Sequence, residues 1–338
     1  MKYICGPVLG IETSCDETSV AIVENKSILA NIVSSQTELH KKWGGIVPEV
    51  AARKHTEAII PCIDSALHNA GISISEIVGV GVTNRPGLVG ALSIGVTAAK
   101  VIACSFAIPL VGVHHLEAHI LSPLMSAEVP FPHLCLLVSG GHTELILVEH
   151  PGRYRRLGGT IDDAAGEAFD KCARAIGMGY PGGPAIQEAA KTGRSTRYSL
   201  PRGLKEPTFD FSFAGLKTAT LQLVEKEGLN LNINDAAASV EEAITSVLSD
   251  RAMYACRESN CKAITLSGGV AANQRLRNKL EMGCAERNIL FVAAPMDLCT
   301  DNAAMIAHVA AWRLSLGESD ELDMDVFGRS DLPQEKEP

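Results

Sequence analysis

Two histidines one helical turn apart give this chain its clearest candidate for metal binding. The segment His115-Leu116-Glu117-Ala118-His119 follows an apolar, strand-like run and resembles the start of a helix. Residues at positions i and i+4 share one helix face, so the two imidazoles can bind the same cation. An ordinary pair of surface histidines is the alternative, and the pattern alone does not decide between the two.

Three glycine-rich turns are typical of sites where backbone N–H groups approach an anion. Ser139-Gly140-Gly141 and Ser267-Gly268-Gly269 each follow an apolar strand, and Gly182-Gly183-Pro184 follows Tyr180-Pro181. None fits the Walker pattern or the dinucleotide-binding glycine fingerprint. Each turn could be structural by itself, but together they favour a nucleotide site with a different phosphate clamp.

Several carboxylates stand near helix starts, where capping competes with ligand binding. Asp162 and Asp163 precede an expected helix and are most simply its caps. Asp170 lies two turns inside that helix and could accept hydrogen bonds from ligand hydroxyls. Asp301 either caps the next helix or completes a metal site with the two histidines. Two histidines and one carboxylate with open positions suit zinc or non-haem iron.

The elements that must position these residues indicate a duplicated α/β fold. Strands expected at 9–11 and 19–23 flank an acidic turn, and strands expected at 134–138 and 144–148 repeat this plan about 125 residues later. Helical and strand-like stretches alternate through the rest of the chain. We therefore expect two related lobes. The N-terminal lobe spans 1–128 and is rejoined by a returning helix at 302–318, the C-terminal lobe spans 129–301, and an acidic, loosely ordered tail spans 319–338.

Composition limits the setting in which the protein works. The ten cysteines form no Cys-x-x-Cys pair, which is typical of reduced thiols, and no run of about 18 apolar residues suggests a membrane span. We expect a cytoplasmic protein that does not interact with a membrane. A net charge of −9 argues against non-specific coating of nucleic acid but leaves room for a local RNA site.

Seven motifs stand along the chain in one order: Gly10-Ile11-Glu12-Thr13-Ser14-Cys15-Asp16-Glu17-Thr18, His115 to His119, Val138 to Thr143, Asp162 to Lys171, Tyr180 to Pro184, Ser212 to Thr218 and Ser267 to Asn273. In these motifs and their order the chain resembles the bacterial TsaD family, the tRNA adenosine threonylcarbamoyltransferases. The resemblance covers about residues 8 to 316 and departs from the family pattern at two places. Arg85 stands where the family usually has glycine, and Phe327 to Leu332 replace the usual C-terminal Arg-x-Arg-Trp-Pro-Leu.

This resemblance implies a two-lobed fold of the actin, Hsp70 and sugar-kinase type, with the ligand between the lobes. It also assigns roles to particular positions. The metal ligands fall on His115, His119 and Asp301, which would hold one divalent metal per subunit, with iron(II) favoured and zinc as the alternative. The nucleotide and substrate contacts fall on Leu137, Val138, Ser139, Gly140, Gly141, Asp170, Gly183 and Asn273.

By the same resemblance, the expected reaction moves a threonylcarbamoyl group from threonylcarbamoyl-AMP to N6 of adenosine 37 in tRNAs that read ANN codons. Asp16 is our choice for proton transfer or orientation, although a carboxylate in this hairpin turn could serve only to organise the turn. TsaB-like and TsaE-like proteins are the expected partners.

A metallopeptidase is the main alternative, but Glu117 follows His115 by two positions and points about 200° around the helix, unlike the adjacent glutamate of a zincin. The other alternative, a non-catalytic nucleotide-binding scaffold, has no use for a metal.

Overall fold

The fold is known from a computed structural model that describes residues 1–41, 45–204 and 207–333. It divides into two compact units, each built around one five-stranded sheet. Unit 1 comprises residues Met1–Ser126 and Thr300–Pro338, and unit 2 comprises Ala127–Cys299. The chain therefore leaves unit 1 once and returns to it with its last helix.

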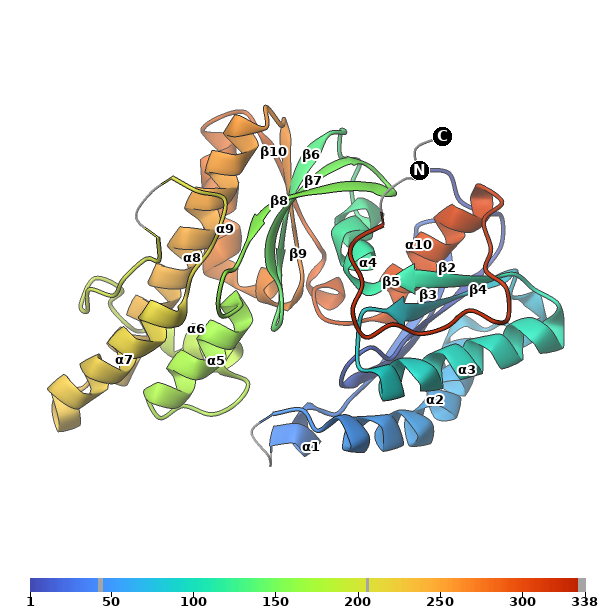
Figure 1. Ribbon diagram of the computed structural model, residues 1–338, viewed down its shortest axis with the longest axis horizontal. Helices are drawn as coiled ribbons and strands as arrows, with labels where there is room; N and C mark the ends of the chain where they lie inside the picture. The colour runs from blue at the N-terminus through green and yellow to red at the C-terminus, as the bar shows by residue number, and fades with distance from the viewer. Residues whose placement is uncertain (42–44, 205–206, 334–338) are drawn as a thin grey trace. The chain divides into compact units, whose positions relative to one another are not determined.

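The sheet of unit 1 has the strand order β3-β2-β1-β4-β5 (Figure 1). Strands β1, β2 and β3 form an antiparallel meander, whereas β4 and β5 run parallel to β1. Parallel strands require crossover connections, and helices supply them here. The strands are β1 (Val8–Glu12), β2 (Glu17–Glu24), β3 (Ser27–Ser35), β4 (Gly79–Arg85) and β5 (Leu110–His114).

The sheet of unit 2 repeats this topology with the order β8-β7-β6-β9-β10. Its first three strands are antiparallel, and β9 and β10 run parallel to β6. The repeat confirms the prediction of a duplicated α/β fold. The strands are β6 (His133–Val138), β7 (Thr143–His150), β8 (Arg153–Gly159), β9 (Ala263–Ser267) and β10 (Leu290–Ala293).

Helices cover both faces of the sheet in unit 1. On one face α2 and α3 pack against an apolar layer that includes Ile11 and Val82. On the other face α10 packs directly on β1 and β4, because Gly10 and Gly81 leave no side chain between the helix and the sheet. The helices are α1 (Thr37–Lys41), α2 (Pro48–Ala70), α3 (Val89–Phe106), α4 (His115–Leu121) and α10 (Ala303–Ser315).

Helix α3 is the one described helix that is long and apolar enough to cross a membrane. It carries Lys100 and buries Ala91, Val96 and Ala99 within the core of unit 1. A buried core helix passes the same test of length and hydropathy, so the feature is weak support for a membrane span.

The core of unit 2 is built around α8, the longest helix, whose alanine-rich surface is largely buried. Helices α6 and α9 pack against it, and α5 packs against both α6 and α7. Phe169 of α5 lies in this core together with Phe211 and Phe213, which precede α7. The helices are α5 (Ala165–Ala175), α6 (Gly182–Ala190), α7 (Ala214–Glu227), α8 (Ile233–Glu258) and α9 (Gln274–Ala285).

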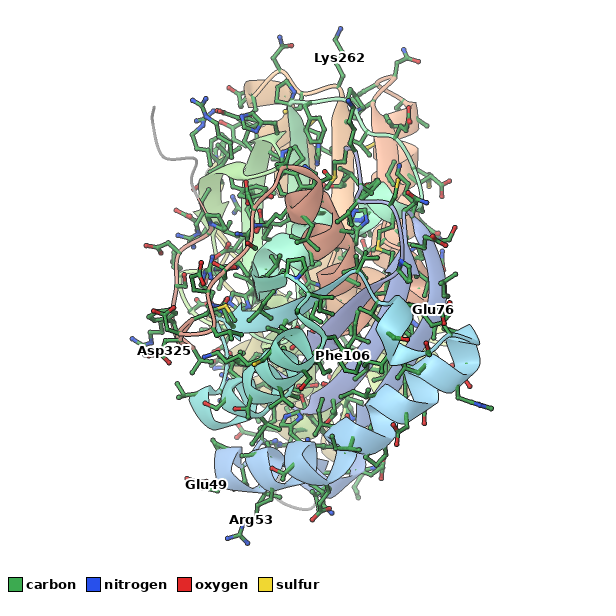
Figure 2. The ribbon with its side chains drawn as sticks, turned by 90° about the vertical axis from the view of Figure 1, so that its right-hand side faces the viewer. Glu49, Arg53, Glu76, Phe106, Lys262 and Asp325 are labelled. Atoms are coloured by element: carbon green, nitrogen blue, oxygen red, sulfur yellow. The ribbon has the colours of Figure 1, made fainter. Side chains whose placement is uncertain are left out.

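The acidic segment after α10 returns across β4 and β5 of unit 1, as the dark red trace in Figure 1 shows. Asp320 pairs with Leu110, and Met324 packs on the hydrophobic core beside Gly112. Figure 2 shows the Asp325 side chain pointing outward, while the Asp325 carbonyl oxygen accepts a hydrogen bond from Asn84. Composition alone suggested loose order from residue 319 onward, whereas these contacts are specific. Residues 334–338 of that stretch lie outside the described residues.

Candidate functional site

The two motif histidines lie in α4, which directly follows β5, with their Nε2 atoms directed at one carboxylate. His115 is the first residue of α4, and His119 lies one turn further along the helix. Asp301 Oδ1 lies 3.0 Å from His119 Nε2 and 3.5 Å from His115 Nε2. One ligand atom from each of the three residues lies within 4.8 Å of the other two. This donor set and spacing suit a divalent cation with open coordination positions.

Asp301 is available to this cluster because its neighbour caps the following helix. Asn302 is the N-cap of α10, and its side chain accepts a hydrogen bond from the Met305 N–H at 3.1 Å. Sequence reasoning left Asp301 undecided between capping and metal binding. The geometry assigns the cap to Asn302 and places Asp301 beside the histidines.

Negative charge around His115 favours a cation at this point in unit 1. Burial by itself lowers the pKa of His115, but the charges of Asp301 and Glu12 outweigh it and raise the pKa to about 9. The imidazole side chains are nearly inaccessible, whereas Asp301 keeps 24% of its side chain exposed. A divalent cation can replace the proton as the positive partner of these carboxylates.

A second carboxylate, that of Glu17 at the start of β2, escaped sequence reasoning, which singled out Asp16. Burial, followed by the charges of Asp16 and Asp301, raises the pKa of Glu17 to about 9. Glu17 also accepts a hydrogen bond from Ser35 Oγ at 3.0 Å. The acidic composition of the turn gave no sign of this, because the burial of Glu17 depends on the fold.

Unit 2 contains a separate cavity of about 240 Å³ in which the three glycine turns meet. Gly140 comes from the turn after β6, Gly269 from the turn after β9, and Gly183 from the first turn of α6. Cβ atoms added at these three glycines would meet nothing within 4 Å. The backbone is therefore accessible to a ligand. The remaining lining residues are Gly166, Phe169, Asp170, Pro181, Pro184, Gln187, Val270, Ala272 and Asn273.

Asp170 and Asn273 line the cavity while also organising its walls. Asp170 Oδ1 accepts the Gly182 N–H at 2.7 Å, and burial is the main reason that the pKa of this carboxyl is raised. Asn273 is the N-cap of α9: its Oδ1 accepts the Leu276 N–H at 2.9 Å, and its Nδ2 donates to the buried Glu241 at 2.8 Å. Both side chains are therefore held in fixed orientations.

The other expected nucleotide contacts lie in or beside the turn after β6. Leu137 and Val138 are buried in the strand, and Ser139 and Gly141 belong to the turn, but these four do not line the cavity itself. The turn and α5 approach closely because a side chain at Gly166 would collide with the backbone of Ser139 and Gly140.

Asp162 caps a different helix from the one that its position in the sequence suggests. Its carboxylate accepts hydrogen bonds from Ser212 Oγ at 2.6 Å and from the Phe213 N–H at 2.7 Å, at the start of α7. Helix α5 begins at Ala165, whose N–H donates instead to Thr143 Oγ1. Asp163 binds Lys171 at 2.5 Å, so both acidic residues hold elements of unit 2 together.

Comparison with known proteins identifies relatives along most of the chain. Residues 27–308 match the family described as "TsaD: tRNA N6-adenosine threonylcarbamoyltransferase". A protein of that name from Dehalococcoides mccartyi is 50% identical over 323 residues, which cover 95% of this chain and 97% of the relative. Another protein of that name, from Microcystis aeruginosa, is 48% identical over 334 residues, which cover 96% of this chain and 96% of the relative.

Solved structures with low sequence identity share the fold. Full-length HypF in a phosphate- and nucleotide-bound form aligns with a TM-score of 0.61 and 14% identity, covering 94% of this chain and 47% of that one. The activator of 2-hydroxyisocaproyl-CoA dehydratase from Clostridium difficile, with bound ADPNP, aligns with a TM-score of 0.53 and 13% identity, covering 93% and 98%. At these identities the likeness extends to the fold alone.

Proposed function

This chain belongs to the TsaD family of tRNA N6-adenosine threonylcarbamoyltransferases, and from that premise we propose that it transfers the threonylcarbamoyl group of threonylcarbamoyl-AMP to N6 of adenosine 37 in tRNAs that read ANN codons. The N6 amine attacks the carbamoyl carbonyl carbon and forms a C–N bond. The C–O bond to the phosphate breaks, AMP leaves, and the amine loses one proton. The observation that carries this proposal is that one chain combines a three-ligand cation site with a glycine-walled cavity.

In this proposal unit 2 holds the adenylate. The N–H groups of Gly140 and Gly141 donate to phosphate oxygens, and Leu137, Val138 and Ser139 present that turn. Hydroxyl groups of the ligand donate to the carboxylate of Asp170, which lines the cavity. The backbone of Gly183 and the amide of Asn273 complete the contacts. Donors that are already oriented in the protein lose little entropy when the ligand binds.

The residues of unit 1 fit the metal that the family implies, because two imidazole nitrogens and a carboxylate oxygen converge on one point. His115, His119 and Asp301 would hold one divalent cation per subunit, with iron(II) as our first choice and zinc as the alternative. When bound, the cation supplies a Lewis acid and a template for the reacting group.

We assign Asp16 the tasks of orienting the attacking amine and accepting its proton.

The protein is proposed to work in the cytoplasm with TsaB-like and TsaE-like partners. Its net charge of −9 disfavours unaided retention of tRNA, since tRNA binding depends on cationic side chains. Partners that contribute positive charge would relieve this repulsion.

Reconstitution with defined tRNAs tests the proposal. The purified chain, its partners, threonine, bicarbonate, ATP and the enzyme that makes the adenylate should modify tRNA that carries adenosine beside the anticodon. A matched transcript with guanosine at that position is the control and should remain unmodified. Metal-dependent cleavage of a protein substrate, with no modified nucleoside in the complete mixture, would favour a metallopeptidase instead.

A further inference from the structure

The ring of His115 is held from the side opposite to Asp301 by a buried carboxylate at the end of β1. Its Nδ1 lies 3.0 Å from Oε2 of Glu12 and 3.2 Å from Oγ of Ser14. Glu12 has no exposed surface. The ring therefore has one nitrogen directed at the carboxylate of Glu12 and the other directed at the cation site.

The other contacts of Glu12 fix the orientation of its carboxylate. Oε1 accepts the Ser14 N–H at 2.5 Å, and Oε2 accepts the hydroxyl of Thr83 at 2.5 Å. An ionised carboxylate is only an acceptor, so a neutral His115 can bind Oε2 only by donating its Nδ1 proton. That tautomer leaves a lone pair on Nε2, which is the form that binds a metal.

We propose that Glu12 is a positioning residue that holds His115 as the Nδ1–H tautomer and aims its Nε2 at the cation. The inference rests on the cation site of the proposed function. Carboxylates behind metal-bound histidines fix the ring and increase its basicity as a ligand. His119 lacks such support, because no described residue offers a hydrogen-bond partner to its buried Nδ1.

Replacing Glu12 by glutamine changes the tautomer with almost no change in shape. The Ser14 N–H can only donate, so the glutamine oxygen must remain beside it. The glutamine NH2 group then faces Nδ1 of His115 and donates to it. Nδ1 then accepts this hydrogen bond, and a neutral ring carries its proton on Nε2. A metal bound at Nε2 would force that proton onto Nδ1, where it would face the NH2 group, another donor.

The experiment compares Co²⁺ binding to the metal-free full-length wild type, Glu12→Gln and the matched control Thr83→Val. We expect Glu12→Gln to lower Co²⁺ affinity about 10- to 100-fold and to alter the visible absorption of bound Co²⁺. Thr83→Val removes another hydrogen bond from the same carboxylate but leaves the contact with His115, so affinity and spectrum should stay close to wild type. Melting curves establish that each variant is folded.

Wild-type affinity and spectrum in folded Glu12→Gln would overturn the role of Glu12 while leaving the cation site standing. Equal losses in Glu12→Gln and Thr83→Val would overturn it as well, by indicating general disruption. A wild type that binds no Co²⁺ would overturn the cation site and this inference together. Should Glu12→Gln fail to fold, nitrogen NMR of the Zn²⁺-loaded wild type decides, because the proposal requires a proton on Nδ1 of His115.

Discussion

Acid should destabilise unit 1 through His308, a buried residue of α10 that packs against the N-terminal segment. The residue is fully buried, and neither ring nitrogen has a hydrogen-bond partner among the described residues. Its ring packs against Tyr3 with centroids 5.2 Å apart. Burial, reinforced by the charges of Lys26 and the N-terminal amine, lowers the pKa of His308 to about 3. The native protein therefore keeps this imidazole neutral.

The size of the effect follows from proton linkage. An exposed histidine in the unfolded chain has a pKa of about 6.5, so below that pH the unfolded state binds a proton that the folded state excludes. The free energy of unfolding is therefore unaffected by this group above pH 6.5, and it falls as the pH decreases from 6.5 towards 3. At pH 5 the loss amounts to about 2 kcal/mol, a substantial part of the 5–15 kcal/mol typical of folded proteins.

Urea unfolding at pH 7.5, 6 and 5 measures this loss in the wild type and in His308→Leu. Circular dichroism follows the whole chain. With Trp43→Phe in both proteins, the remaining tryptophan, Trp312, gives a fluorescence signal from the same helix, α10. The leucine variant should lose about 2 kcal/mol less than wild type between pH 7.5 and 5. At pH 7.5 it should be at least as stable, because two unpaired buried nitrogen atoms are removed. Identical pH dependence in both proteins would refute the reasoning.

Four further substitutions test the cation site, the cavity and the core separately. His115→Ala or His119→Ala should abolish stoichiometric metal in elemental analysis with little change in melting temperature. Full metal occupancy in both variants would show that neither histidine is a metal ligand. Asp170→Ala should lower the affinity for an adenylate, measured by calorimetry, more than the affinity for Co²⁺. Equal losses of the two affinities would contradict the assignment of Asp170 to the hydroxyl groups of the ligand. Gly10→Ala should cost at least about 1–3 kcal/mol in urea unfolding, because the added methyl collides with the Ala303 carbonyl oxygen, and wild-type stability would contradict this packing.

Much of the fold could be predicted because its signals are local. The strand–turn–strand units at the start of each sheet alternate apolar runs with small or acidic turns, and their recurrence predicted the duplicated topology that the sheets confirm. The spacing of His115 and His119 is likewise a local pattern. Helix α6 was missed, since its short Gly-Gly-Pro start resembles a turn.

The supporting contacts of the site could not be predicted because they join distant parts of the chain. Glu12 and His115 are 103 residues apart, and Asp162 caps a helix about 50 residues further along. Nothing in the sequence distinguished Asp301 from Asn302 as the cap of α10, because both residue types are good caps. Composition also suggested a loose tail, although Asp320 and Met324 make specific contacts with β5.

The most direct test of the proposed function measures products from preformed threonylcarbamoyl-AMP. The chain and its partners are mixed with a tRNA that carries adenosine 37, and mass spectrometry quantifies the modified nucleoside beside released AMP. We predict one modified nucleoside per AMP with the wild type and no transfer with Asp301→Ala, which loses a charged cation ligand but keeps the glycine turns. AMP release without modified nucleoside in the wild type, or undiminished transfer by Asp301→Ala, would contradict the account.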